Sequence, residues 1–170
     1  MRTLAALAAF ALAAAPLSAQ VSVRGLANVG YDAGYGAASA GVGAEVGWAP
    51  AGAPVAIALR PSADLVFVGS HEYADPLLGG SPRSRYTANV TRASLEAVAR
   101  WAAAPGPAIP YLKAGVTAEY EQVLIGDVDS GRWQEDAVAG GGALLGRFYA
   151  EATLGFGDAS RSRVALGVRF

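Results

Sequence analysis

The 170-residue sequence contains no cysteine, and this absence removes several functional classes at once. Without cysteine the chain has no disulfide framework, no thiol nucleophile and no thiolate metal site. A surplus of basic charge is also missing, because 13 Lys and Arg stand against 14 Asp and Glu. No positive field therefore indicates nucleic-acid binding.

Charged residues are scarce, at 16% of the chain, while 53% of the residues are hydrophobic and the mean hydropathy is +0.31. A soluble domain typically carries about 25% charged residues. Long apolar runs are nevertheless missing after residue 20, since none reaches the roughly 18 residues expected of a transmembrane helix. The hydrophobic residues must therefore be distributed over a different geometry.

The first 19 residues have the parts of a secretory signal peptide. Arg2 supplies the positive region, and residues 4–15 form an apolar segment too short to span a bilayer. Pro16 disfavours the alternative, an anchor helix, and the LSA tripeptide that follows it is a small-residue cleavage site. We expect residues 1–19 to be cleaved and residues 20–170 to form one exported domain.

Beyond residue 20, apolar side chains alternate with other side chains at a period of two, which is the pattern of β-strands. Eight such segments are expected at residues 21–31, 38–48, 55–67, 86–101, 112–120, 136–144, 148–156 and 163–170. Pro61 and a change of phase near Thr91 each predict a β-bulge. Short connections rich in Pro, Gly or Ala (49–54, 102–110, 144–147) alternate with more polar ones near 31–37, 69–85 and 121–135.

Soluble and membrane barrels share this alternation, and three features favour the membrane. The apolar faces cover about 9–11 residues, enough for a tilted transmembrane strand. The opposite faces mix charges of both signs with small residues, which suits the narrow interior of a small barrel. Aromatic residues gather at strand ends, as in two interfacial girdles: Tyr31, Trp48, Phe67, Tyr86, Trp101, Tyr120, Phe148 and Phe156.

The pattern therefore predicts an all-β fold, an eight-stranded antiparallel up-and-down transmembrane β-barrel. A secreted β-sandwich or a lipocalin-like barrel is the alternative, although a sandwich would place its aromatic residues mid-strand.

The signal peptide, PYLKAGV at residues 110–116 and RVALGVRF at residues 163–170 carry a family likeness. Together they resemble the small eight-stranded bacterial outer-membrane barrels of the OmpA/OmpX type, a porin-like family, over the whole of residues 20–170. The resemblance implies residence in the outer membrane. It also implies that the assembly machinery recognises the last strand through alternate hydrophobic residues and a final aromatic, here Val164, Leu166, Val168 and Phe170.

The faces opposite the apolar ones are expected to point into the barrel interior, called the lumen below. Their charged residues are Arg24, Glu45, Arg60, Asp64, Arg92, Glu96, Arg100, Lys113, Glu119, Glu151, Arg163 and Arg169. Folding the hairpins at their turns brings Glu45 near Arg60 and Glu96 near Lys113. A salt-bridged plug is favoured over a narrow ion path, because eight strands leave little room beyond side chains.

One histidine, His71, lies beside Ser70 and Glu72 and suggests the parts of a hydrolase. Neighbours along an extended segment point in different directions, however, whereas a site needs a converging nucleophile and base. Tyr73 also stands where a serine would share a strand face with the histidine, as in a lipid A-modifying barrel. We therefore expect no enzyme activity.

Two other segments resemble known binding motifs but lack residues that those motifs require. In DVDSGRWQED (127–136), Gly131 and Arg132 stand where a calcium loop needs an oxygen ligand and a glycine, so a polar surface loop is expected. GVGAEVG (41–47) lacks the spacing of a phosphate loop and the helix that follows one. No cofactor and no metal ion are expected.

These observations predict a monomeric structural or surface-interaction protein of the bacterial outer membrane with a charge-paired, plugged lumen. The expected partners are outer-membrane lipids and lipopolysaccharide, the assembly machinery and periplasmic chaperones, with no nucleic acid. The alternative functions are a narrow ion or small-solute pore and, with least support, a lipid A-modifying enzyme.

Overall fold

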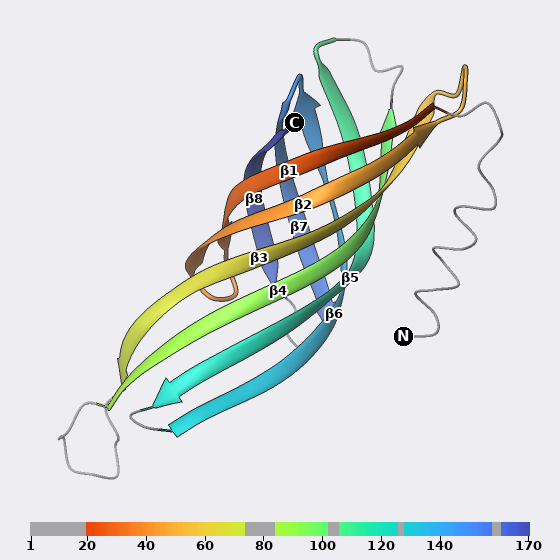
Figure 1. The fold of residues 1–170 in the computed structure, drawn as a ribbon. Helices are drawn as coiled ribbons and strands as arrows, with labels where there is room; N and C mark the ends of the chain where they lie inside the picture. Colours follow the sequence, from red (N-terminus) through yellow and green to blue (C-terminus); the bar gives the residue numbers. More distant parts are fainter. Residues whose placement is uncertain (1–19, 74–83, 102–105, 126–127, 158–160) are drawn as a thin grey trace.

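The strands of this protein form a single closed antiparallel barrel (Figure 1). The structure is a computed structural model that describes residues 20–73, 84–101, 106–125, 128–157 and 161–170. Its strands are β1 (Gln20–Asp32), β2 (Ala37–Ala49), β3 (Val55–Tyr73), β4 (Ser84–Trp101), β5 (Ala108–Ile125), β6 (Val128–Leu145), β7 (Phe148–Gly157) and β8 (Ser162–Arg169). The predicted eight-stranded up-and-down barrel is confirmed; the predicted signal peptide, residues 1–19, lies outside the described residues.

The barrel closes where β1 pairs with β8, from Leu26↔Arg169 to Asp32↔Arg163. Phe170 extends this ladder, since its backbone N–H donates to the Gly25 carbonyl (3.1 Å) and its carbonyl accepts from the Gly25 N–H (2.9 Å). The start of β1 and Phe170 therefore lie at the same end of the barrel, called the terminus end below, and the opposite end, which holds the β1–β2 turn, is called the hairpin end (Figure 1).

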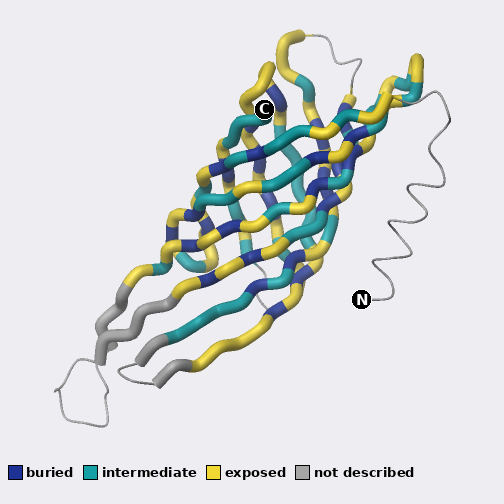
Figure 2. Tube along the Cα trace, viewed as in Figure 1, coloured by how far each residue is buried: buried dark blue, intermediate teal, exposed yellow. Residues whose placement is uncertain are grey.

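Burial alternates along the strands, so that one face of the wall is exposed and the other is buried (Figure 2). On β1, Val23 and Val29 are exposed while Leu26 and Asn28 are buried. Exposed strand positions are mostly apolar and include many Val, Leu, Ala and aromatic residues, whereas many buried positions are charged. This distribution is the reverse of a soluble protein, whose charged residues are almost never fully buried unless paired. No helix among the described residues is long and apolar enough to cross a membrane.

Both predicted bulges are wrong in position. Pro61 stays in register opposite Leu95, and the β4–β5 register runs unbroken through Thr91. The irregularity lies in β3 between Val66 and Gly69, where Gly69 adopts a φ of 76° that favours glycine. The change of apolar phase near Thr91 has another cause, because Val90 points into the lumen and packs against Val66 there.

The long surface loops predicted at 69–85 and 121–135 are also wrong, over most of 121–135 and over those parts of 69–85 that the structure describes. Residues 69–73, 84–85, 121–125 and 128–135 are strand, and the cross-strand pairs run from Glu121↔Arg132 to Ile125↔Val128. Residues 74–83 and 126–127 lie outside the described residues. The outer parts of β3 to β6 thus form a four-stranded sheet, called the protruding sheet below, that extends past the β1–β2 turn at the hairpin end (Figure 1). Strong β-propensity and cross-strand pairing outweighed the polar composition here.

Aromatic side chains lie on the outward faces near both ends of the barrel. Tyr31, Phe67, Trp101, Phe148 and Phe156 are exposed, while Trp48 and Tyr120 are partly buried. The side chain of Tyr86 lies outside the described residues. Trp133, which the sequence placed in a loop, is exposed in β6 and lies 5.0 Å from the Tyr120 ring, centroid to centroid.

Candidate functional site: the charged lumen

The lumen is filled by charged side chains from all eight strands, together with smaller clusters of apolar ones. Buried members of the predicted set are Glu45, Arg60, Asp64, Arg92, Glu96, Arg100, Lys113, Glu119 and Glu151. Arg24, Arg163 and Arg169 are partly buried. Glycines leave space for these side chains: a Cβ on Gly41 would overlap the Asp64 carboxylate, and one on Gly142 would lie 2.8 Å from the Tyr111 ring.

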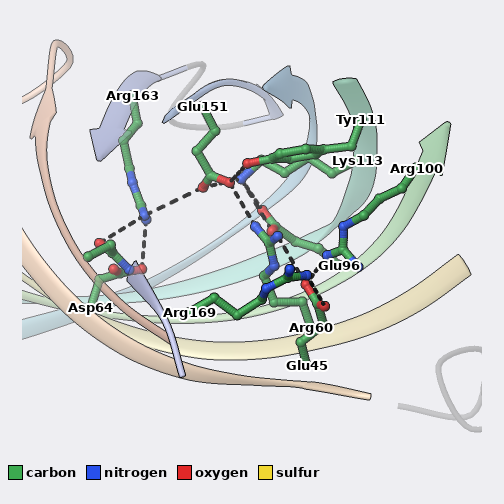
Figure 3. A network of polar contacts seen from close by, with 11 residues as sticks. Glu45, Arg60, Asp64, Glu96, Arg100, Tyr111, Lys113, Glu151, Arg163 and Arg169 are labelled. Carbon is green, nitrogen blue, oxygen red and sulfur yellow. Dashed lines mark hydrogen bonds and ion pairs between the residues drawn. The ribbon is translucent and has the colours of Figure 1, made fainter. Parts of the chain in front are cut away.

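Three arginine side chains contact the Glu45 carboxylate near the terminus end of the barrel (Figure 3). Its Oε2 accepts hydrogen bonds from Arg60 Nη2 (3.3 Å) and from Arg100 Nη2. Arg169 Nη1 lies 3.9 Å from the other oxygen, Oε1. The Glu45–Arg60 pair predicted from the hairpin is therefore present, and it belongs to a larger cluster.

Glu151 holds the centre of the network (Figure 3). It accepts hydrogen bonds from Arg60 Nη1 (2.7 Å), Lys113 Nζ (2.8 Å) and the Tyr111 hydroxyl (2.8 Å). The Arg60 guanidinium also lies 5.4 Å from the centroids of the Tyr111 and Tyr149 rings, a cation–π distance. Three strands, β3, β5 and β7, thus meet at one carboxylate.

Glu96 and Lys113 form the second predicted pair. Lys113 Nζ donates to Glu96 Oε1 at 2.9 Å and to Oε2 at 3.2 Å. The strand register places Arg60 directly opposite Glu96. Lys113 therefore bridges two buried carboxylates, Glu96 and Glu151, and its single charge is shared between them.

A second group of charges lies toward the hairpin end. Arg92 donates to Asp32 and, at 2.6 Å, to Glu119, which also accepts from Arg161 at 2.5 Å. The Tyr35 hydroxyl donates to Glu119 (3.2 Å), and the Arg161 guanidinium lies 3.5 Å from the Tyr35 ring centroid. These contacts draw the β1–β2 turn over this end of the lumen.

Asp32 also shapes the turn itself. Its Oδ1 accepts the backbone N–H groups of Gly34 (3.0 Å) and Tyr35 (3.1 Å), while Oδ2 accepts from Arg92. An aspartate that caps its own turn in this way is a common turn-forming device. Asp32 is completely buried. Its hydrogen bonds to the turn backbone and to Arg92 link the turn to the charged network.

Arg163 extends the central network around Glu151 to Asp64 and Asn28. Its Nη1 donates to Asp64 (2.7 Å), its Nη2 donates to Asn28 (3.3 Å), and Nη2 lies 4.0 Å from Glu151 Oε1. The charged side chains therefore form a nearly continuous set of contacts along the lumen.

The sequence reasoning missed Asp32, Tyr35, Tyr111 and Arg161. The first had a readable signal, because Asp32 continues the inward phase of Asn28 and lies one residue past the predicted strand end. Tyr111 likewise shares its phase with Lys113. Tyr35 and Arg161 lie outside the strands, where strand alternation gives no information on side-chain direction.

Little free space remains among these side chains. A cavity of about 30 Å³ lies in the lumen, lined in part by Asp32, Arg92, Glu119, Arg161 and Arg163. A buried water needs roughly 10–15 Å³ of such volume, so this cavity has room for one or two waters at most.

The remaining candidate motifs do not form a site among the residues that the structure describes. No group of three or more His, Asp or Glu in the described part of the chain is arranged to hold a metal ion. His71 lies in β3 opposite Tyr86, and its side chain, like those of Ser70, Glu72 and Tyr73, lies outside the described residues. The 128–136 part of the DVDSGRWQED segment is paired strand, which corrects the surface loop expected there.

No family model and no curated protein matches the chain. Among solved structures, Neisserial surface protein A (NspA) is 14% identical, with a TM-score of 0.52 over 89% of this chain and 97% of that one. The N-terminal β-barrel domain of Pseudomonas aeruginosa OprF is 19% identical (TM-score 0.46; 89% and 100%), and Ail, the attachment invasion locus protein of Yersinia pestis, is 12% identical (0.47; 89% and 97%). These are small eight-stranded outer-membrane β-barrels, and the likeness to NspA shows that the chain has their fold.

Proposed function

Starting from the barrel fold shared with these proteins, we propose that the chain is an outer-membrane protein whose plugged barrel acts as a scaffold for contacts at the cell surface. Residues 1–19 serve as its cleaved export signal, and the hairpin end faces the exterior. The proposed partners are outer-membrane lipids and lipopolysaccharide at the barrel, with the assembly machinery and chaperones acting during insertion.

The single observation that carries the membrane assignment is the inverted burial pattern. The outward face exposes large apolar side chains on every strand, including Val23, Leu65, Leu112, Leu154 and Leu166. An apolar surface of this extent is a liability in water, whereas in lipid it is the stable arrangement. A closed barrel also satisfies the backbone groups of every strand within the wall, as a bilayer requires.

The plug is supported by how the lumen charges are paired. Glu45, Glu151 and Glu119 each contact at least two basic side chains, and the small cavity beside Glu119 has room for water molecules only. Paired buried charges lower the cost of burial, and eight strands enclose a space that side chains fill. We therefore propose that the lumen stabilises the barrel and carries no ion current.

The surface role is supported by the protruding sheet. Residues 128–135 of β6 pair with β5 but have no partner on their other side among the described residues, because the β6–β7 pairs begin at Asp136↔Gly157. An unpaired edge presents backbone donors and acceptors to any approaching molecule. Arg132 and Trp133 are exposed on it.

Two measurements test the proposal. The folded protein should migrate faster than its boiled form on a detergent gel, and solubility in plain buffer without such a shift would refute the membrane barrel. Planar-bilayer recordings should show no conductance steps from the folded protein. Steps whose ion preference reverses in Lys113→Glu would instead establish the narrow pore.

A further inference from the structure

The terminus end of the lumen gathers four basic side chains around one carboxylate. Arg60, Arg100 and Arg169 converge on Glu45, at 3.3 Å for Arg60 and 3.9 Å for Arg169 (Figure 3). Arg24 stands directly opposite Glu45 in the β1–β2 register and shares the inward phase of β1. None of the ion pairs among the described residues includes Arg24.

The neighbouring carboxylates do not offset this charge. Glu151 is shared by Arg60 (2.7 Å) and Lys113 (2.8 Å), and Glu96 contacts Lys113 at 2.9 Å. The basic groups in this part of the lumen are Arg24, Arg60, Arg100, Lys113 and Arg169, and the acidic groups are Glu45, Glu96 and Glu151. The cluster therefore carries two more positive charges than negative ones.

Two hydrogen-bond donors in the cluster also have no acceptor. The Nε atoms of Arg60 and Arg100 are buried without a hydrogen-bond partner, although both residues are more than nine-tenths buried. A buried donor that lacks a hydrogen-bond partner is unfavourable. The partner that suits several converging guanidinium groups is an oxyanion, which accepts from two donors of each arginine at once.

The cluster can be reached from outside the barrel. Arg100 is the last residue but one of β4 and Arg169 is the last residue of β8, so both lie at the terminus end. Their side chains are 10% and 15% exposed, and Arg24 is partly buried. An ion arriving at this end reaches the arginines without crossing the central network around Glu151.

We propose that Arg24, Arg100 and Arg169, arranged around Glu45, bind a phosphate-type oxyanion at the terminus end of the lumen. The oxyanion belongs either to a free phosphate compound or to the headgroup of a phospholipid at that membrane interface. This site does not depend on the surface contacts proposed above, which involve the opposite end of the barrel.

The first experiment measures thermal unfolding of the folded full chain in phosphate-free non-ionic micelles. One arm adds sodium pyrophosphate, one adds sodium chloride at equal ionic strength, and one adds phosphatidylglycerol to the micelles. Binding to the folded state should raise the Tm by about 5 °C or more at one hundred times the Kd. A rise with pyrophosphate identifies a soluble ligand, and a rise with the lipid alone identifies a headgroup. No rise beyond that with chloride overturns the proposal.

Variants separate this site from general attraction to a basic surface. The double variant Arg24→Gln with Arg169→Gln should lose the phosphate-specific rise. Arg147→Gln removes one positive charge from the exposed β6–β7 turn at the same end, outside the lumen cluster, and it should keep the rise. An equal loss in Arg147→Gln would contradict a site in the lumen.

Glu45→Gln provides a readout that a purely structural cluster would not give. Removing the one carboxylate that competes for these arginines should tighten pyrophosphate binding, measured by equilibrium dialysis of the folded protein with radiolabelled pyrophosphate. If the double arginine variant does not fold, this variant decides: tighter binding supports the proposal, and unchanged or weaker binding overturns it.

Discussion

Replacing Glu151 by glutamine tests whether the charged network holds the barrel together. The substitution keeps the size of the side chain but removes its charge from hydrogen bonds to Arg60 (2.7 Å), Lys113 (2.8 Å) and Tyr111 (2.8 Å). A hydrogen bond to a charged group contributes about 1.5–3 kcal/mol, and breaking a buried ion pair by removing one partner costs about 3–5 kcal/mol. Because Lys113 retains Glu96 and Arg60 retains Glu45, the lower end applies. We expect a loss of about 3 kcal/mol.

The assay is reversible urea unfolding in lipid vesicles, followed by tryptophan fluorescence. Glu135→Gln is the matched control, since Glu135 is exposed in β6 and its loss should change the free energy of unfolding by no more than about 0.5 kcal/mol. In a double-mutant cycle, Lys113→Gln combined with Glu151→Gln should cost less than the two single losses added together. A loss below about 1 kcal/mol in Glu151→Gln would show that the network contributes little to stability.

Three further predictions concern the wall and its closure. Gly142→Ala should abolish the fast-migrating form on detergent gels, because its Cβ would lie 2.2 Å from a backbone carbonyl oxygen of β7; a normal gel shift would contradict this. Glu96→Gln should lower the Tm in micelles, since Lys113 then loses one of its two carboxylates, and an unchanged Tm would argue against pairing there. Phe170→Ala should slow refolding into vesicles by removing the ring that covers Gly25, and an unaltered refolding rate would leave the ring without a role in closure.

The hairpin contacts of the lumen were readable from the sequence because they are local. Glu45 and Arg60 lie on adjacent strands joined by a short turn, as do Glu96 and Lys113, so period-two phase and turn position are enough to bring each pair together. The hydrogen bond between Arg60 and Glu151 could not be predicted in this way, because these residues are 91 positions apart and lie on β3 and β7. That contact depends on the closure of the barrel.

The predicted surface loops failed for a related reason. Polar residues in 121–135 read as a loop when each residue is considered alone, yet Glu121↔Arg132 and the pairs that follow extend the β5–β6 ladder. Cross-strand pairing stabilises such residues in a sheet even where one face is not apolar. The misplaced bulge at Thr91 has the same origin, since Val90 is apolar but points inward against Val66.

By itself the sequence determined the eight-strand pattern, the face that most strand side chains take and the inverted distribution of charge, because all three follow from a period of two along the backbone. The tertiary structure decided which charges meet across the lumen. Barrel closure and strand stagger set that pairing, and neither is encoded within a single hairpin. Only the closed barrel gathers Arg24, Arg100 and Arg169 around Glu45, since these arginines come from β1, β4 and β8.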